Sequence, residues 1–315
     1  HFADYMEMYE KLGDKIDAVN VAIPDHSHAR ASIEAMKRGK HVYCQKPLAH
    51  TVWECRQMKL WAEKSGVITQ MGNQIHSAIE YRLAVRLLRD SAIGKIKEVH
   101  SWVGVDGCER TAFYDHPPKS LESPPPANVN WDLWVGPAPM RGYVADAYHP
   151  FVWRDWQDFG SGGFGDFGCH IFDPIFTALE LTAPTSVRAE HSGTNREVWP
   201  GPERVYYTFP GTKWTAPEIK VTWYDGKLQP PKELAQMPAD LSLPKAGSLV
   251  IGELGNMIIP HVAGPRMYPL EKFQTYPYPK DVKGLEHRHV WIDHIFDNEK
   301  TSDGFHYAGP LAETV

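Results

Sequence analysis

Asp166 and His170 have the residue types and the spacing of a proton-transfer pair. They stand four positions apart, so on a helix both side chains face the same side. A carboxylate can orient a neighbouring imidazole, and histidine titrates near neutral pH, so the pair suits a general base. Asp173 follows on nearly the same face, and Pro174 predicts either a kink or a new helix capped by Asp173. The alternative is a glycine-rich helix start with an incidental polar stripe.

Lys46 ends a predicted buried strand, directly before Pro47. In open α/β sheets ligands bind beyond the carboxyl ends of the strands, where a lysine can donate to a developing oxyanion. The alternative is a solvated lysine at a strand end. The neighbouring strand ends carry polar residues too, at positions 25–28 and at Asn73 and His76. We therefore expect these side chains to gather at one edge of one sheet.

The histidines His26, His28 and His76 raise a metal-site alternative. His-x-His beside an aspartate can bind zinc or manganese. Asp25 or Ser27 is explained equally well as the N-cap of the next helix. We predict that no metal is bound.

Residues 160–165 match the pattern Gly-x-Gly-x-x-Gly. A dinucleotide fingerprint follows a buried strand and opens a helix within a βαβ unit. Residues 153–159, just before the match, are charged and aromatic, unlike a buried strand. We therefore predict that this match is not a phosphate-binding turn.

The elements that must position these residues change in character along the chain. Up to residue 76, three apolar runs predict parallel strands and two amphipathic stretches predict the helices between them, as in half of a doubly wound sheet. Beyond it, alternating patterns predict a mostly antiparallel sheet. The expected strands are 17–24, 41–46, 67–71, 95–105, 186–191, 205–209, 218–223 and 249–259; the expected helices are 2–11, 29–38, 51–65 and 77–90.

A proline- and tryptophan-rich segment, residues 107–158, separates the first two strands of the second sheet. Segments of this length are usually functional or disordered, and the aromatic content argues against disorder. His149, Trp153 and Arg154 are candidate substrate contacts in it, because indole rings offer flat apolar platforms.

Composition excludes several classes of protein. The net charge is -6, from 33 basic and 39 acidic residues, whereas nucleic-acid binders are normally basic. No apolar run approaches the roughly 18 residues of a membrane span. Four scattered cysteines without a Cys-x-x-Cys pair predict free thiols. We expect no nucleic-acid partner and no membrane segment; the sequence leaves the compartment open, cytoplasmic by default, or periplasmic if a leader precedes residue 1.

Two stretches resemble the signatures of the Gfo/Idh/MocA oxidoreductase family. Residues 24–49, PDHSHARASIEAMKRGKHVYCQKPLA, resemble the first, and residues 162–173, GGFGDFGCHIFD, resemble the second, GGxxxDxxxHxxD. The resemblance implies an α/β fold: a partial Rossmann domain at residues 1–76, then an α+β domain at 77–315 with an open, mostly antiparallel sheet. It further implies homodimers or homotetramers formed through the open sheet face.

The resemblance also implies roles for individual residues. Lys46, Asp166 and His170 would form the catalytic group, and Asp173 would bind substrate hydroxyls. NAD or NADP would be the cofactor, with contacts from Pro24, His28, Gln45, Lys46 and Asn73.

The sequence departs from the family pattern in several places. Gln45 replaces the Glu of Glu-Lys-Pro, and Asp25 replaces the usual Asn. The first strand, its glycine turn and the acidic ribose reader are expected before residue 1, and the last helix is expected to be cut short. We therefore expect the chain as given to bind the cofactor weakly.

Three functions follow from this sequence analysis. The first is an NAD(P)-dependent oxidoreductase that acts on a hydroxyl of a sugar, sugar derivative or inositol-like polyol. The second is an NAD-dependent glycoside-cleaving enzyme that works by transient oxidation and elimination. The third is a cofactor-free carbohydrate-binding or scaffold protein. Substrate identity, cofactor preference and reaction direction are left open.

Overall fold

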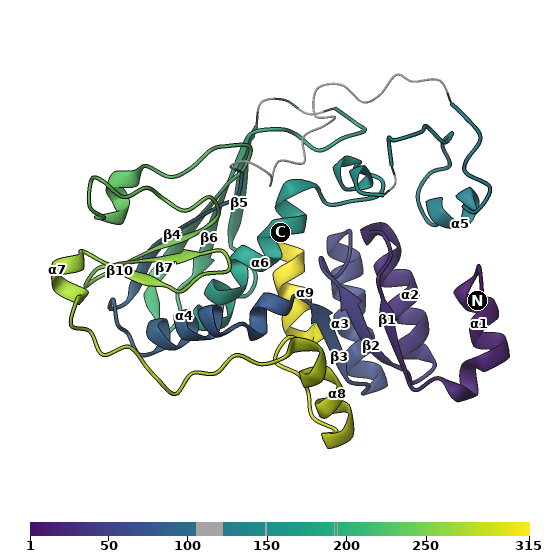
Figure 1. Cartoon of the computed structure of the whole chain (residues 1–315), viewed down its shortest axis with the longest axis horizontal. Helices are drawn as coiled ribbons and strands as arrows, with labels where there is room; N and C mark the ends of the chain where they lie inside the picture. The colour runs from purple at the N-terminus through teal and green to yellow at the C-terminus, as the bar shows by residue number, and fades with distance from the viewer. Residues whose placement is uncertain (105–121, 149, 192, 194) are drawn as a thin grey trace.

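The computed structural model describes residues 1–104, 122–148, 150–191, 193 and 195–315, and contains two sheets on either side of a central helix, α6 (Figure 1). The first sheet is parallel, in the order β1-β2-β3. The predicted α/β class is confirmed. Its elements are α1 (Tyr5–Leu12), β1 (Ala18–Val21), α2 (Asp25–Lys37), β2 (His41–Gln45), α3 (Val52–Ser65) and β3 (Thr69–Gly72).

Local sequence signals set the ends of α3. The Thr51 hydroxyl accepts from the Glu54 amide, and the Glu54 carboxylate accepts from the Thr51 amide, which completes the predicted capping box. Gly66 ends the helix with φ 70°, a left-handed conformation that glycine adopts without strain. The predicted bounds of this helix are confirmed.

Strand β1 is less buried than predicted. Asn20 is exposed, Ala18 and Val19 are half-buried, and Val21 is buried. Among the described residues β1 pairs only with β2, so it lies at the edge of the sheet. An edge strand leaves one side of its backbone unpaired, which explains the exposure.

The second sheet has seven strands in the order β10-β9-β8-β4-β7-β6-β5. Neighbouring strands are antiparallel except β4 and β7, which are parallel, so the prediction of a mostly antiparallel sheet is confirmed. The strands are β4 (Ile96–Trp102), β5 (Ser186–His191), β6 (Glu203–Pro210), β7 (Thr215–Tyr224), β8 (Gly247–Gly252), β9 (Asn256–Pro260) and β10 (Arg266–Tyr268).

The prediction of one strand over residues 249–259 is wrong, because this stretch belongs to the hairpin of β8 and β9. The Gly252 amide donates to the Gly255 carbonyl at 2.9 Å and closes the turn. A Cβ on Gly252 would lie 2.1 Å from the Ile93 carbonyl oxygen, so a side chain there would displace the packed backbone. Residues 253–255, Glu-Leu-Gly, form the turn between the two strands.

Helix α6 (Gly162–Leu179) is buried along nearly its whole length and passes through Pro174 without ending. The prediction of a new helix at Asp173 is therefore wrong. Proline removes one hydrogen bond, to the His170 carbonyl, and packing on several sides outweighs that loss. Asp166 and His170 lie one turn apart on this helix, as predicted.

The remaining helices contact different sheets: α8 packs against β3 of the first sheet, and α7 packs against β10 of the second. α9 packs against α3 and β3 of the first sheet and against α6, so the end of the chain returns to the first sheet (Figure 1). The domain boundary between residues 76 and 77 stays a prediction. These helices are α4 (Ile79–Arg89), α5 (Trp131–Val135), α7 (Leu270–Phe273), α8 (His287–Asp297) and α9 (Phe305–Thr314).

The described part of the tryptophan-rich segment packs into an aromatic cluster of its own. The Trp131 and Trp134 rings stack with centroids 4.8 Å apart, and Phe159 meets Trp134 edge-on at 4.9 Å. This cluster fixes the segment beside the first sheet, because the Trp134 and Val135 carbonyls bond to His26 of α2.

Among the described residues, no helix combines the length and the apolar character that crossing a bilayer requires. Cys44, Cys55 and Cys169 are buried free thiols, as predicted, and Cys108 lies outside the described residues.

Candidate active site

A cavity of about 520 Å³ lies beyond the carboxyl ends of β1 and β2. Parallel strands direct their carboxyl ends to one edge of a sheet, where ligands bind. The structure brings together six residues predicted to form the site, four from the first sheet and two from the tryptophan-rich segment. These lining residues are Pro24, His28, Gln45, Lys46, Trp153 and Arg154.

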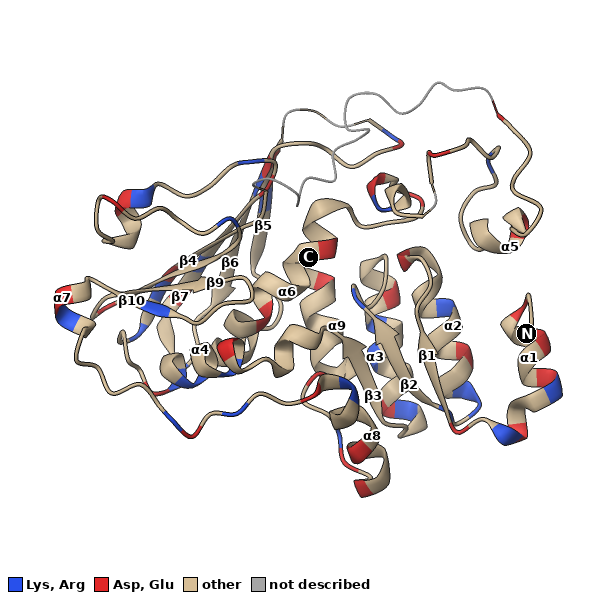
Figure 2. Ribbon diagram, in the orientation of Figure 1, with Lys and Arg blue, Asp and Glu red and all other residues tan. Residues whose placement is uncertain are grey.

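Lys46 contacts Asp166 directly. Its Nζ donates to Asp166 Oδ1 at 2.5 Å and to the Asp166 carbonyl at 2.9 Å. The Arg154 Nε lies 3.6 Å from the same carboxylate oxygen, and its guanidinium lies 4.2 Å from the centroid of the Trp153 ring. Helix α6 carries acidic but no basic residues (Figure 2), so both cations come from other elements.

His170 is bonded to Asn73, which follows β3. The His170 Nδ1 donates to Asn73 Oδ1, and the Asn73 Nδ2 donates to the Cys169 carbonyl at 3.1 Å. The second bond fixes the orientation of the amide, so its oxygen, which can only accept, faces the imidazole. In neutral His170 the proton therefore sits on Nδ1, and Nε2 is the nitrogen that can accept a proton.

Asp25 is a buried carboxyl of the same group, with an exposed fraction of 3%. The Ser161 hydroxyl donates to its Oδ2 at 3.2 Å. Burial, followed by the negative charge of Asp166, raises the pKa of Asp25 to about 7, although Lys46 and Arg154 oppose the shift. From the sequence, Asp25 is one of the polar residues expected at this sheet edge, a departure from the family pattern and a possible helix cap. In the structure it lies at the expected edge, but its side chain does not cap α2.

His261 is a neighbour of His170 that the sequence did not reveal. The two rings are 5.7 Å apart between centroids, and His261 Nδ1 is 3.1 Å from the Tyr81 hydroxyl. Burial and then the positive charge of Lys46 lower the pKa of His261. No motif surrounds this residue, which follows β9 in the second sheet, so only the tertiary structure places it here.

Both ring nitrogens of His26 and of His28 lie within hydrogen-bonding distance of backbone carbonyls. His26 contacts the carbonyls of Phe159 and Val135, and His28 contacts those of Pro47 and Ile23. Two imidazoles held in this way fix the strand ends and the aromatic segment. The metal alternative built on His26 and His28 together with His76 is therefore not supported.

Asp173 points to a different set of partners from Asp166. Its Oδ1 accepts from His76 Nδ1 and from the Tyr307 hydroxyl, each at 2.8 Å. It lines a second cavity, on the side of α4. Its role as a substrate ligand stays a prediction, and His149, predicted to contact substrate, lies outside the described residues.

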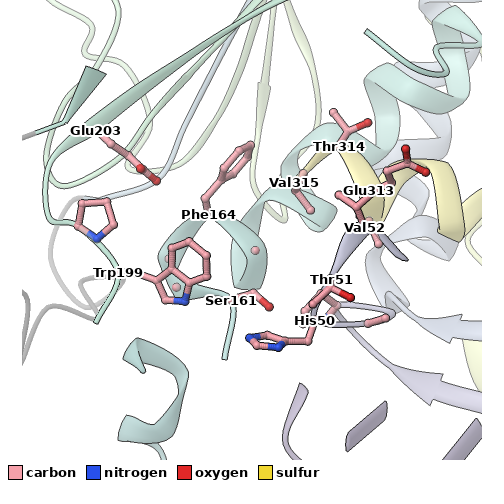
Figure 3. Close-up of a pocket in the computed structure, with 17 residues that line it drawn as sticks. His50, Thr51, Val52, Ser161, Phe164, Trp199, Glu203, Glu313, Thr314 and Val315 are labelled. Carbon is pink, nitrogen blue, oxygen red and sulfur yellow. The ribbon is translucent and has the colours of Figure 1, made fainter. Parts of the chain in front are cut away.

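Residues 161–165 of the glycine-rich match line a third cavity, shown in Figure 3. The match follows a 3-10 helix (Val152–Asp155) and a loop instead of a strand, as predicted. Glu203 also lines this cavity, and burial, followed by the charge of Asp225, raises the pKa of Glu203 to about 8. The match therefore lacks the strand that precedes a dinucleotide fingerprint.

The first cavity fits the nicotinamide end of a dinucleotide. Gln45 ends β2 there, Pro24 lies between β1 and α2, and indole and guanidinium groups form the facing wall. Gly72 of β3 leaves room for the Gln45 amide, because a Cβ at position 72 would lie 2.7 Å from Gln45 Oε1. Pro24, His28, Gln45 and Lys46 are the residues that would hold this part of the cofactor.

Comparisons with known proteins agree with this geometry. Residues 1–73 match the model "Oxidoreductase family, NAD-binding Rossmann fold", and residues 107–212 match "Oxidoreductase family, C-terminal alpha/beta domain". Together the two matches cover more than half of the chain. The chain therefore belongs to the Gfo/Idh/MocA oxidoreductase family, and its first part is an NAD-binding Rossmann fold.

The chain is similar to several sugar-related proteins. It is 24% identical over 159 residues to levoglucosan dehydrogenase of Pseudarthrobacter phenanthrenivorans, a match covering 50% of the chain and 32% of that protein. It is 33% identical over 88 residues to 2,7-anhydro-N-acetylneuraminate hydratase of Mediterraneibacter gnavus, covering 28% of the chain and 24% of that protein. These matches thus span a quarter to a third of the relatives.

A solved structure shares the fold over almost the whole chain. Levoglucosan dehydrogenase in complex with NADH and levoglucosan superposes with a TM-score of 0.61 at 16% identity. The superposition covers 99% of this chain and 79% of the other.

Proposed function

We propose that this protein is an NAD(P)-dependent oxidoreductase that acts on a hydroxyl of a sugar, sugar derivative or inositol-like polyol. One observation carries the proposal: Lys46 and Asp166 form an ion pair, and one helical turn further on His170 is held by Asn73 with Nε2 as its basic nitrogen. The similarity to levoglucosan dehydrogenase supports the substrate class.

The proposed chemistry uses the residues of this chain in distinct roles. His170 Nε2 accepts the proton of the substrate hydroxyl, and the Lys46 ammonium stabilises the negative charge that develops on the oxygen. Asp166 holds Lys46 in place through the 2.5 Å contact. A nicotinamide bound beside these residues would supply the hydride acceptor for the carbon that bears this hydroxyl.

Trp153 and Arg154 form the proposed substrate wall. The guanidinium lies 4.2 Å from the centroid of the indole ring, so the two side chains stiffen each other beside Lys46. An indole wall suits the apolar face of a sugar ring, and a guanidinium can donate to its hydroxyls. We propose both as substrate contacts.

The test measures reduction of NAD+ or NADP+ by the chain with a panel of sugars and polyols. Lys46→Ala and His170→Ala are expected to lower kcat at least about 100-fold, the usual range for a lost acid–base group. His289→Ala, at an exposed position of α8, is the matched control and is expected to keep wild-type rates. Wild-type rates in both site variants, with the fold intact by circular dichroism, would refute the assignment.

A second candidate function is supported by the similarity to a 2,7-anhydro-N-acetylneuraminate hydratase. In that case transient oxidation of a hydroxyl would acidify the neighbouring carbon and permit elimination at a glycosidic bond. The same residues would act, so kinetics must separate the two. Net formation of reduced cofactor favours the dehydrogenase, and cleavage without it favours elimination.

We also propose a homodimer or homotetramer. All six residues of β5, the last strand of the second sheet, are exposed. An exposed sheet edge and face of this kind are commonly covered by a partner. Light scattering coupled to gel filtration tests the proposal, and a monomer at all concentrations would contradict it.

A further inference from the structure

Three buried side chains of the types that bind metals lie close to one another. None of them belongs to the proposed catalytic group of Lys46, Asp166 and His170. They are His76 of the 3-10 helix Gln74–Ser77, Asp173 of α6, and Asp303, which lies shortly before α9. One ligand atom from each lies within 4.8 Å of those of the other two. The exposed fraction is 8% for His76 and 1% for each aspartate.

Asp303 points to a missing cationic partner. Neither of its carboxylate oxygens has a hydrogen-bond partner among the described residues. The His287 Nε2 is 3.7 Å from Asp303 Oδ2, but it already bonds to the Met71 carbonyl at 2.8 Å. Burying an ionised carboxylate without a partner is strongly unfavourable, so such a group stays protonated, pairs with a cation or coordinates a metal.

The distances around His76 are close to those of a coordination sphere. His76 Nδ1 lies 2.8 Å from Asp173 Oδ1. Ligands about 2.0–2.1 Å from a tetrahedral Zn²⁺ stand roughly 3.3 Å from one another, so a small outward movement makes room for an ion.

The outer contacts of these ligands also follow the usual pattern of a metal site. His76 Nε2 lies 2.9 Å from the Ser302 hydroxyl, and the Tyr307 hydroxyl donates to Asp173. Metal-binding histidines almost always use their second nitrogen in this way, which fixes the tautomer and the ring orientation.

We propose that His76, Asp173 and Asp303 bind one divalent transition-metal ion of the Zn²⁺ type. One imidazole and two carboxylates suit zinc and manganese, and a charge of +2 balances the two buried aspartates. Asp173 then binds the ion instead of a substrate hydroxyl. The site shares only His76 with the metal alternative raised from the sequence.

The ion has a route to the site. His76, Asp173 and Ser302 line a cavity of about 580 Å³, and a solvent molecule from it would fill the fourth position. Arginines also line this cavity, but they are engaged elsewhere: Arg86 pairs with Asp90 and Asp281. Two further guanidiniums donate to carbonyls: Arg82 to that of Lys283, and Arg89 to that of Thr177.

The role assigned to this ion is structural. It would join the end of the parallel sheet to α6 and to the segment before α9, three parts of the chain that are distant in sequence. It is independent of the proposed hydride transfer, because the Lys46 and His170 contacts involve other residues.

The experiment measures Zn²⁺ binding to the complete chain. Protein stripped with a chelator is titrated with ZnCl2, and with MgCl2 as a comparison, by isothermal calorimetry and thermal unfolding. We expect one Zn²⁺ per chain, a rise in Tm with Zn²⁺, and no matching effect of Mg²⁺. Asp303→Asn and His76→Gln are each expected to weaken Zn²⁺ binding at least tenfold, whereas Asp281→Asn, at the exposed rim of the same cavity, is expected to bind like wild type.

Three results would overturn the proposal. They are no Zn²⁺ binding by the wild-type chain, equal affinity in the two ligand variants, and an equal loss in Asp281→Asn. Circular dichroism of each variant identifies one that fails to fold, and the wild-type titration decides the question even then. Because the readouts are metal content and Tm, the result does not depend on enzymatic activity.

Discussion

Replacing Asp25 by asparagine is expected to change how the stability of the chain depends on pH. Asp25 is buried, and burial together with the charge of Asp166 raises its pKa from 3.8 to about 7. The unfolded chain therefore releases this proton more readily than the folded chain. Stability from this group is greatest below pH 3.8, falls as the pH rises through the window up to about 7, and is constant above it.

The size of the effect follows from the two pKa values. Each tenfold change in the protonation equilibrium is worth about 1.4 kcal/mol, so the full shift corresponds to about 4 kcal/mol. Between about pH 5 and about pH 8 the wild type should lose about 3 kcal/mol of stability that Asp25→Asn keeps. Comparing the two proteins cancels the other titrating groups that they share.

Urea unfolding of both proteins at several pH values between those limits measures this difference. Asp14→Asn, at an exposed position, is the matched control and should follow the wild type throughout. A wild-type-to-variant difference that stays constant with pH would show that burial does not hold the proton on Asp25.

The remaining predictions concern His170, a helix cap and the core. Asn73→Leu removes the acceptor of His170 Nδ1. It is expected to lower kcat by about tenfold or more and to shift the pH profile of kcat, with KM little changed. An unshifted pH profile would contradict the assignment of the proton to Nδ1. Thr51→Ala removes the capping box of α3 and should lower the free energy of unfolding by about 1 kcal/mol, as measured by urea titration. An unchanged free energy of unfolding would show that the capping box does not stabilise the helix. Leu87→Ala, in the fully buried core, should cost about 2–5 kcal/mol, whereas the exposed Leu60→Ala should cost far less; similar losses for both would contradict the burial.

The parallel sheet and the shared helix of Asp166 and His170 could be predicted because their signals are local. The capping box at Thr51, the glycine at position 66 and the four-residue spacing of Asp166 and His170 act within one or two turns of backbone. The prediction of strands failed where one local pattern is compatible with two structures. Residues 249–259 alternate like one strand, yet Gly252 and Gly255 fold them into a hairpin.

The sequence by itself determined the order of the elements, the family and the residue types gathered at the end of the parallel sheet. Only the tertiary structure decided which side chain meets which. His170 bonds to Asn73, 97 positions away, His261 arrives from the second sheet, and Asp303 joins His76 and Asp173. The physical reason is that hydrogen bonds and ion pairs require separations of a few ångströms, and the packing of distant segments sets those separations.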